Sequence, residues 1–405
     1  MGAAASIPAS IQEAEEQGVV KHDIITFLDA HPESVAGVRD EMLERVRVDG
    51  NELGNVPKIL QNDKEVVLAA VSNNGYALFQ ASEALRNDYE VVLAAMMNSR
   101  DGAAIKQATD TIKGDKTFML AVLKRDCEQG RRWLGRKVLV NGLEHASDDL
   151  KRDKEFMLAA VQECHEFGPS PLIFAPDTLK DDKDIVRAAS IRRAQAFDSA
   201  SDRLKNDKDF ALDLVKQHGG ILEFVSDTLK DNKEVVLAAI QEQGSATGLR
   251  SVLSFASDEC RNDKEIVLAA VKMSQVGLEY ASTVLQDDKD VVIAAVALSG
   301  LALRYASTRL KGDKEVILLA VSKGGSLGWA SDVLKDDKEV VLATLVYDGR
   351  QLKFASDALK NDKEVVLAAV THLGLALEFA SDALKNDIEV IAAATAEDEG
   401  DIKYY

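Results

Sequence analysis

The residues that could bind a metal or act as nucleophiles are few and scattered in this sequence. Six histidines and three cysteines occur among 405 residues, and Cys164 and His165 stand side by side. A structural zinc site needs four such ligands, usually supplied as two close pairs, and no second pair accompanies this one. We therefore interpret Cys164 and His165 as chance neighbours, and we expect neither a metal nor a cofactor.

Carboxylates are abundant, but their spacing fits neither a calcium loop nor a catalytic pair. The run Asp181–Asp184 lacks the glycine and the distal glutamate of a calcium loop, and such runs lie where helices are expected to begin. No glycine-rich phosphate loop follows a predicted strand. The sequence predicts no catalytic residues, and an enzyme of unknown type is the third and weakest hypothesis.

The densest positive charge lies in one stretch around a tryptophan. This stretch falls in the longest interval between repeats, from Asp115 to Asp153. In a chain of net charge -19, such a patch could contact an acidic partner, a phosphate or a lipid headgroup. The alternative is that its arginines pair with carboxylates of neighbouring repeats. The candidate partner-binding residues are Arg125, Arg131, Arg132, Trp133, Arg136 and Lys137.

The first residues fit the pattern for N-myristoylation. Gly2 becomes the first residue once Met1 is removed, and Ser6 stands four residues after it. A single myristoyl chain gives only marginal, reversible membrane binding. Gly2 is therefore a candidate lipidation site for weak membrane association, and a plain leader of small residues is the alternative.

These candidates are set in a chain that repeats one phrase thirteen times. The first full copy begins at Asp63 and reads Asp-Lys-Glu-Val-Val-Leu-Ala-Ala-Val, and most copies follow at intervals of 24 or 25 residues. Self-similarity at a fixed period is typical of a solenoid, in which stacked units bury each other's faces. We predict an all-α solenoid of about thirteen two-helix repeats of about 25 residues. The anchor residues of the copies are Asp63, Asp88, Asp115, Asp153, Asp182, Asp207, Asn232, Asp263, Asp288, Asp313, Asp337, Asp362 and Asp387.

The first helix of each repeat is expected to start at the anchor, with Asn62 or Asp63 as its cap in the first copy. Six apolar residues follow, too many for a one-sided stripe, so this helix should pack between those of its neighbours. The position of Ala69 is alanine in eleven of the thirteen copies. We expect adjacent helices to approach closely there.

The second helix, after a turn that usually carries glycine, is clearest in Leu377–Leu384. A serine recurs in it ten times, and Pro57 and Pro176 stand at the same position in two other copies. Proline is tolerated in the first turn of a helix and disrupts its interior, so the helix should begin or bend at this serine. We interpret the serines as caps rather than phosphorylation sites, and the aromatic residue before them as part of the inward face.

The phrase Asn-Asp-Lys-Glu-Val-Val-Leu-Ala-Ala-Val, followed by Leu-x-Phe/Tyr-Ala-Ser-x-x-Leu, resembles the helical repeat family catalogued as domain of unknown function 4116. The resemblance covers roughly residues 63–394. It implies a tandem helical fold, and it implies no activity and no catalytic residues.

Three regions are expected along the chain. Residues 1–62 should form a leader and a helical cap with a degenerate repeat at Asp40–Val46, residues 63–394 the tandem solenoid, and residues 395–405 a short acidic tail. Terminal repeats have one face toward water and are expected to be more polar. Within the solenoid, Arg187 and Asp213 replace apolar residues in successive repeats, and we predict a partly buried ion pair between them.

Composition limits the functions further. The net charge and a pI near 4.9 argue against nucleic-acid binding, and three separated cysteines suggest a reducing, cytoplasmic location. No apolar run reaches the length of a membrane span. The leading hypothesis is a non-catalytic scaffold or adaptor that binds protein partners. The alternative is a peripheral membrane protein held by a myristoylated Gly2 and the basic stretch.

Overall fold

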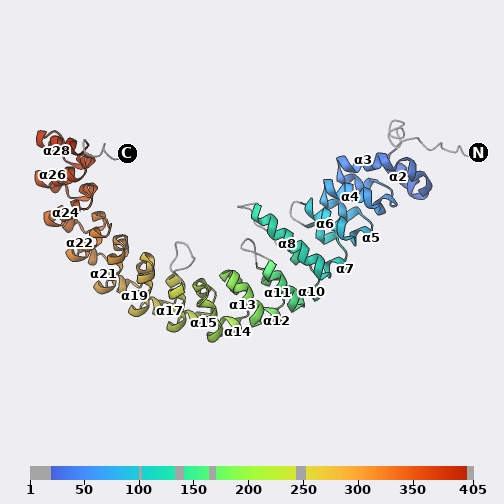
Figure 1. Cartoon of the computed structure of the whole chain (residues 1–405), viewed down its shortest axis with the longest axis horizontal. Helices are drawn as coiled ribbons and strands as arrows, with labels where there is room; N and C mark the ends of the chain where they lie inside the picture. The colour runs from blue at the N-terminus through green and yellow to red at the C-terminus, as the bar shows by residue number, and fades with distance from the viewer. Residues whose placement is uncertain (1–19, 100–102, 133–140, 164–169, 243–251, 399–405) are drawn as a thin grey trace, which may run out of the picture. The chain divides into compact units, whose positions relative to one another are not determined.

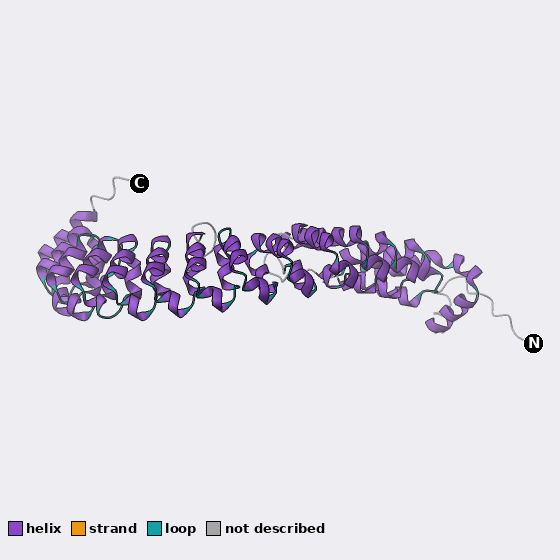
Figure 2. Ribbon diagram, turned by 90° about the horizontal axis from the view of Figure 1, so that it is seen from below, coloured by secondary structure: helices purple, strands orange, loops and turns teal. Residues whose placement is uncertain are grey.

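The protein is an α-solenoid of short, repeated helices. The computed structural model describes residues 20–99, 103–132, 141–163, 170–242 and 252–398, and all regular elements in these ranges are α-helices or 3-10 helices (Figures 1 and 2). The chain divides into two compact units, Met1–Ser201 and Asp202–Tyr405. Each unit is described by itself.

One repeat contains three helical elements. In the first full copy, the long helix α4 (Lys64–Asn73) is followed by the 3-10 helix η4 (Gly75–Gln80) and the one-turn helix α5 (Glu83–Arg86). Each of the thirteen anchor residues directly precedes a long helix. Long helices pack against neighbouring long helices, and 3-10 helices against neighbouring 3-10 helices. Each unit is therefore built of two layers.

The described part of the first unit begins with two elements that precede the repeats, α2 (Lys21–Ala30) and η1 (Pro32–Gly37). Its long helices are α3 (Arg39–Val48), α4, α6 (Tyr89–Met97), α8 (Lys116–Arg132), α11 (Lys154–Glu163) and α13 (Lys183–Arg192). Its second layer holds η2 (Gly50–Asn55), η3 (Leu60–Asn62), η4, α5, η5 (Ala103–Gln107), α7 (Asp110–Lys113), α9 (Asn141–Glu144), α10 (Asp148–Arg152), η6 (Pro171–Phe174), α12 (Asp177–Lys180) and η7 (Ala194–Ser199).

In the described ranges of the second unit, a long helix, a 3-10 helix and a short helix follow one another in the same order. Its long helices are α15 (Lys208–Val215), α17 (Lys233–Gln241), α19 (Lys264–Met273), α21 (Lys289–Leu298), α22 (Lys314–Ser322), α24 (Lys338–Leu345), α26 (Lys363–His372) and α28 (Ile388–Asp398). Its 3-10 helices before the serines are η8 (Gly219–Glu223), η10 (Val252–Phe255), η11 (Gln275–Tyr280), η12 (Gly300–Tyr305), η14 (Leu327–Trp329), η15 (Gly349–Phe354) and η16 (Gly374–Phe379). Its short helices are α14 (Asp202–Lys205), α16 (Asp227–Lys230), α18 (Asp258–Arg261), α20 (Thr283–Gln286), η13 (Leu310–Gly312), α23 (Asp332–Lys335), α25 (Asp357–Lys360) and α27 (Asp382–Lys385).

The second helix of the predicted two-helix repeat is divided at the serine. Ala81 and Ser82 have extended backbones, with ψ angles of 154° and 156°, between η4 and α5. The Ser82 hydroxyl accepts a hydrogen bond from the backbone N–H of Leu85, which satisfies a free donor of the one-turn helix. The prediction that the helix begins or bends at this residue, with serine as its cap, is confirmed.

The core of the stack is formed by one face of the long helices. In α4, Val66, Val67, Ala70 and Val71 are completely buried, whereas the two residues between them, Leu68 and Ala69, are half-buried. The six-residue apolar run is therefore not buried all round. The expectation of close packing at Ala69 is wrong by one residue, since the buried alanine is Ala70. Successive residues are about 100° apart around a helix, so Ala69 is turned toward the surface.

The close approach occurs instead at the glycine that opens the 3-10 helix. A Cβ atom added to Gly75 would lie 1.9 Å from the carbonyl oxygen of Ala95 in the next repeat, and one on Gly300 would lie 2.0 Å from that of Ala320. Such distances leave no room for a side chain. The glycine lets one repeat touch the long-helix backbone of the next.

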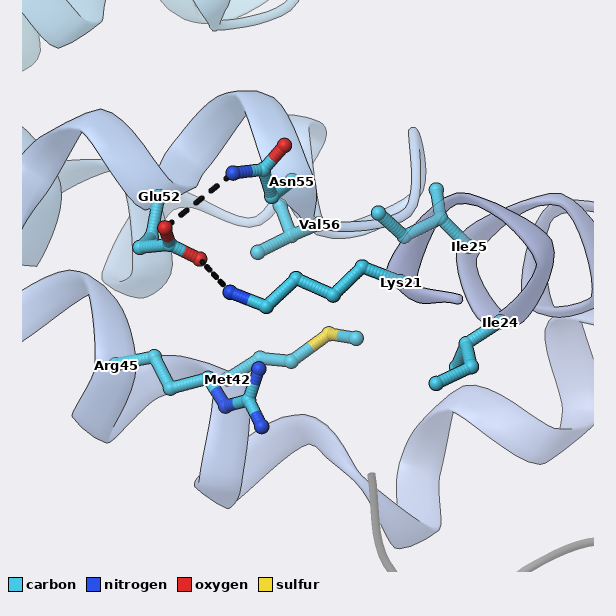
Figure 3. A pocket seen from close by; sticks show the side chains of 8 residues that line it. All are labelled: Lys21, Ile24, Ile25, Met42, Arg45, Glu52, Asn55 and Val56. Carbon is cyan, nitrogen blue, oxygen red and sulfur yellow. Dashed lines mark hydrogen bonds and ion pairs between the residues drawn. The ribbon is translucent and has the colours of Figure 1, made fainter. Parts of the chain in front are cut away.

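The N-terminal end of the first unit is covered by α2 and η1. Helix α3, with Met42 and Val46 buried, corresponds to the predicted degenerate repeat. Figure 3 shows Lys21 of α2 reaching Glu52 of η2, with 3.3 Å between Nζ and Oε2. The small hollow drawn there is lined by Lys21, Ile24, Ile25, Met42, Arg45, Glu52, Asn55 and Val56. At the other end of the chain, α28 continues to Asp398, so the start of the predicted tail is helical.

Candidate interaction surface

A ladder of ion pairs joins neighbouring repeats within each unit. Lys64, directly after the anchor Asp63, places its Nζ 2.8 Å from Asp88 Oδ2 and 2.9 Å from Glu90 Oε2 in the following repeat. The anchor aspartate has two roles at once, because Asp88 also caps its own helix by accepting from the N–H groups of Glu90 and Val91. The same Lys-to-Asp contact recurs at Lys116–Asp153, Lys154–Asp182, Lys233–Asp263, Lys264–Asp288, Lys289–Asp313, Lys314–Asp337, Lys338–Asp362 and Lys363–Asp387.

The ladder shifts the pKa values of its members in opposite directions. Hydrogen bonds to Asp88 and Glu90 raise the pKa of Lys64. Burial acts to raise the pKa of Asp88, but the hydrogen bonds from Lys64 and from backbone N–H groups outweigh it, so this pKa is lowered. The charged form of each group is thus the one that the stack stabilises.

Three residues stand at the ladder position in place of lysine. Arg39 of α3 takes the place of the lysine before the first full copy, with Nε 2.8 Å from Asp63 Oδ2. Tyr89 replaces the lysine in the second copy, and its hydrogen bond to Asp115 raises its pKa. In the last copy the position is Ile388, which is 86% exposed. The ladder ends there within the described residues.

A second ladder runs through the serines. The Ser82 hydroxyl donates to Asn62 Oδ1 of the preceding repeat at 2.6 Å, and its backbone N–H donates to the carbonyl of Gln61 at 2.9 Å. Asp63 is therefore the cap of α4, and Asn62 is the partner of the next serine. Equivalent hydroxyl contacts are made by Thr109, Ser201, Ser226, Ser257, Ser282, Ser307, Ser356 and Ser381.

The exposed side of the long-helix layer forms an aliphatic face with an acidic border. In the second unit this face holds half-buried residues such as Leu268 and Ala269 of α19 and Ile293 and Ala294 of α21. The residue two after the anchor is acidic in every copy of this unit and exposed. In the first unit, a shallow depression on this face is lined by Arg47, Glu65, Leu68, Ala69, Ser72 and Asn73.

The second unit carries a row of aromatic residues in its 3-10 layer, which we call the aromatic row. Each member stands two residues before the repeat serine, and each is half-buried. The members, in seven consecutive repeats, are Phe224, Phe255, Tyr280, Tyr305, Trp329, Phe354 and Phe379. The prediction that these rings lie on the inward face is corrected by their partial exposure. The recurrence of an aromatic residue in seven successive copies was the signal that could have identified them.

Two members of the aromatic row contact the preceding repeat directly. A Cβ atom on Gly328 would lie 2.8 Å from the ring of Phe354, so this ring covers the residue just before Trp329. Burial and a hydrogen bond to Glu279 of the preceding repeat raise the pKa of Tyr305. One side of each of these two rings is therefore occupied by the solenoid itself.

Cations lie over two rings of the row. The guanidinium carbon of Arg304 is 4.9 Å from the ring centroid of Tyr305, and Lys353 Nζ is 4.7 Å from that of Phe354. Both distances are within the range of a cation–π contact. In each case the cation is supplied by the residue directly before the ring.

The residues predicted to form a basic patch are only partly described. Arg125 is half-buried in α8, which at 17 residues is the longest helix within the described ranges. The backbones of Arg131 and Arg132 form its last turn, and their side chains lie outside the described residues. Trp133, Arg136, Lys137 and Gly2 also lie outside them, so this patch and the lipidation site stay predictions.

Two further predictions concern pairs of residues. Arg187 belongs to the first unit and Asp213 to the second, and each is half-buried, so their ion pair stays a prediction. Cys164 and His165 lie outside the described residues. Among the residues that the structure describes, no cluster of three or more His, Cys, Asp or Glu side chains could hold a metal ion. In the same ranges, no helix combines the length and apolar character needed to cross a membrane.

The fold and the two ladders define a tandem-repeat α-solenoid. A family model described as domain of unknown function (DUF4116) matches residues 39–86, 63–101, 192–230, 207–251, 232–286, 276–311, 288–335, 313–360, 337–385 and 362–395. The chain belongs to this family. No curated protein matches it, and no solved structure matches it. These matched segments do not include residues 102–191, although long helices follow the anchors Asp115, Asp153 and Asp182 there as elsewhere.

Proposed function

We propose that the protein is a non-catalytic scaffold that binds other proteins along the surface of its repeats. The observation that carries this proposal is the difference between positions that recur in most repeats and positions that vary from repeat to repeat. The anchor, the lysine, the serine and the glycine hold the stack together. The half-buried positions between them remain available to partners.

The chemistry of these surfaces supports protein partners. The long-helix face combines aliphatic side chains with exposed carboxylates, and the aromatic row adds rings, which are enriched in the energetically dominant parts of protein interfaces. Solenoids present extended surfaces of this kind to their ligands. The peripheral-membrane alternative depends on Gly2 and the basic stretch, and the mass of the N-terminus tests it.

The proposal is tested by affinity purification of the full chain from its native cell, followed by mass spectrometry. The variant Ala269→Glu/Ala294→Glu alters the long-helix face and should remove part of the partner set. Asp213, at the same position in another repeat, shows that the fold accommodates an acidic side chain there. A control, Glu242→Gln, changes an exposed residue at the end of α17 and should keep all partners. A partner set no larger than that of a mock purification would contradict the proposal.

A further inference from the structure

The aromatic row provides five rings without a cation from the residue before them. Where that residue is basic, its charge lies over the ring, as Arg304 and Lys353 show. At Phe224, Tyr280 and Phe379 the same position is an exposed glutamate, and at Phe255 and Trp329 it is Ser254 and Gly328. These five repeats therefore lack the internal cation that the other two possess.

At the three of these repeats that carry a glutamate, the charge is suited to a cation from another molecule. The face of an aromatic ring attracts a positive group, and the negative charge of a nearby exposed carboxylate adds to this attraction. Glu223 and Glu378 are exposed, and among the described residues no ion pair is recorded for either. A guanidinium over Phe224 or Phe379 would thus meet a ring and a carboxylate together. The whole chain, at net charge -19, would also attract a basic partner over longer distances.

We infer that the aromatic row of the second unit is a docking surface for an extended, arginine- and lysine-rich segment of a partner protein. Its cations would occupy ring faces in the manner of Arg304 and Lys353. This inference rests on the proposed scaffold function and names the partner class for one of its surfaces. Arginine should be preferred to lysine, because its planar guanidinium can stack on a ring and bind a carboxylate at the same time.

The site can be altered with side chains that the fold already uses. Glu223→Lys and Glu378→Lys place a lysine directly before Phe224 and Phe379, which reproduces the Lys353–Phe354 arrangement. The native Lys353 and Arg304 show that the backbone accepts a long basic side chain at this position. In the double variant, the internal cations compete with those of the partner.

The matched control is Glu242→Lys/Glu259→Lys in the same unit. Both residues are exposed, neither precedes an aromatic-row residue, and the formal charge change equals that of the test variant. Comparing the affinity losses of the two variants therefore separates the effect at the aromatic row from the general effect of net charge. Circular dichroism of both proteins verifies that each is folded.

The experiment is titration of the full chain with a fluorescein-labelled nona-arginine peptide in 150 mM salt, followed by fluorescence anisotropy. We expect saturable binding to the native chain, an affinity loss of about tenfold in Glu223→Lys/Glu378→Lys and of less than about threefold in the control. Nona-lysine should bind more weakly than nona-arginine. Equal losses in the two variants would overturn the inference, and so would absence of binding to the native chain.

The outcome separates this inference from the scaffold proposal. If nona-arginine fails to bind as expected while Ala269→Glu/Ala294→Glu still removes native partners, the docking surface is wrong and the scaffold stands. If the native chain retains no partner at all, the scaffold proposal falls as well.

Discussion

The two units share one framework and differ on the surface that it carries. Both contain the capped long helices, the lysine ladder, the serine ladder and the close glycine contacts. At the position two residues before the serine, however, the second unit has aromatic rings in seven consecutive repeats, whereas the first unit has Asn55, Gln80, Gln107, His145, Phe174 and Ser199. The position is structurally equivalent in both, since a Cβ atom on Gly54 would meet the Gln80 amide just as one on Gly328 meets Phe354.

This difference shows which positions the fold needs and which it leaves open. A polar amide and a phenyl ring can fill the same place over the preceding repeat without changing the order of helices. The stack is therefore specified elsewhere, by residues that contact the next repeat. The residue two before the serine can therefore vary without changing the stack.

The largest effect should come from the shared glycine. Gly75→Ala in the first unit and Gly300→Ala in the second would each force a methyl group against a backbone carbonyl at about 2 Å, and each should reduce the free energy of unfolding by about 2–3 kcal/mol. Urea denaturation followed by circular dichroism measures this loss. Gly312→Ala is the control, because its added Cβ would meet only Ser331, at 3.5 Å or more. A glycine variant as stable as this control would show that the contact is not required.

The serine ladder should have a smaller effect that depends on its partner. Ser282 caps α20 and donates to Asn262 at 2.6 Å, so Ser282→Ala should reduce the free energy of unfolding by about 1 kcal/mol. For Ser331, the equivalent position in the preceding repeat is Gly312, which has no side chain to accept a hydrogen bond from the serine hydroxyl. Ser331 also makes no side-chain cap bond. Ser331→Ala should therefore change stability by less than about 0.5 kcal/mol. Equal losses in the two variants, measured by thermal denaturation, would contradict the role of the ladder.

The ion-pair ladder should make both units sensitive to acid. The pKa values of Asp88 and Asp288 are lowered from an ordinary value of 3.8. A carboxyl group whose folded pKa is lowered contributes stability that is complete above the unfolded value and is lost as pH falls through the folded value. The melting temperature should thus fall steeply below about pH 4. A melting temperature that stays constant down to pH 2 would exclude this contribution.

The smallest effect should come from single ladder lysines. Lys289 contacts Asp313 and Glu315 at 2.8 Å, and exposed pairs of this kind stabilise weakly and are screened by salt. Lys289→Met should lower the melting temperature slightly, and more at 20 mM salt than at 500 mM. Lys272→Met on the exposed side of α19 is the control without a recorded ion pair among the described residues. The prediction fails if salt affects the two variants equally.

The periodicity of the sequence was sufficient to predict the solenoid, the helix starts and the serine caps. It could not show whether Lys64 meets the anchor of the next repeat or of the previous one, because that depends on how the repeats stack in space. Nor could it place Ala70 rather than Ala69 in the core, since both are small and adjacent. The 3-10 geometry of η4 was also missed, because its apolar spacing alone does not separate it from an α-helix.

The candidate surfaces were less predictable than the fold. The basic stretch around Trp133 is evident from the sequence, but Trp133, Arg136 and Lys137 lie outside the described residues. The recurrence of an aromatic residue is evident from the sequence. Its partial exposure could not be predicted, because it depends on the division of the second helix at the serine. A cation over Tyr305 could be recognised only once Arg304 was placed in space.

The claim that the aromatic row makes the second unit a docking surface is tested most directly by the fluorescence of Trp329. The chain has two tryptophans, and Trp133→Phe leaves Trp329, in the middle of the row, as the only indole. Titration with unlabelled nona-arginine should change its emission in a saturable manner, with the affinity found by anisotropy, and nona-glutamate should have no effect. Binding of nona-arginine without any change in Trp329 emission would place the peptide elsewhere and contradict the claim.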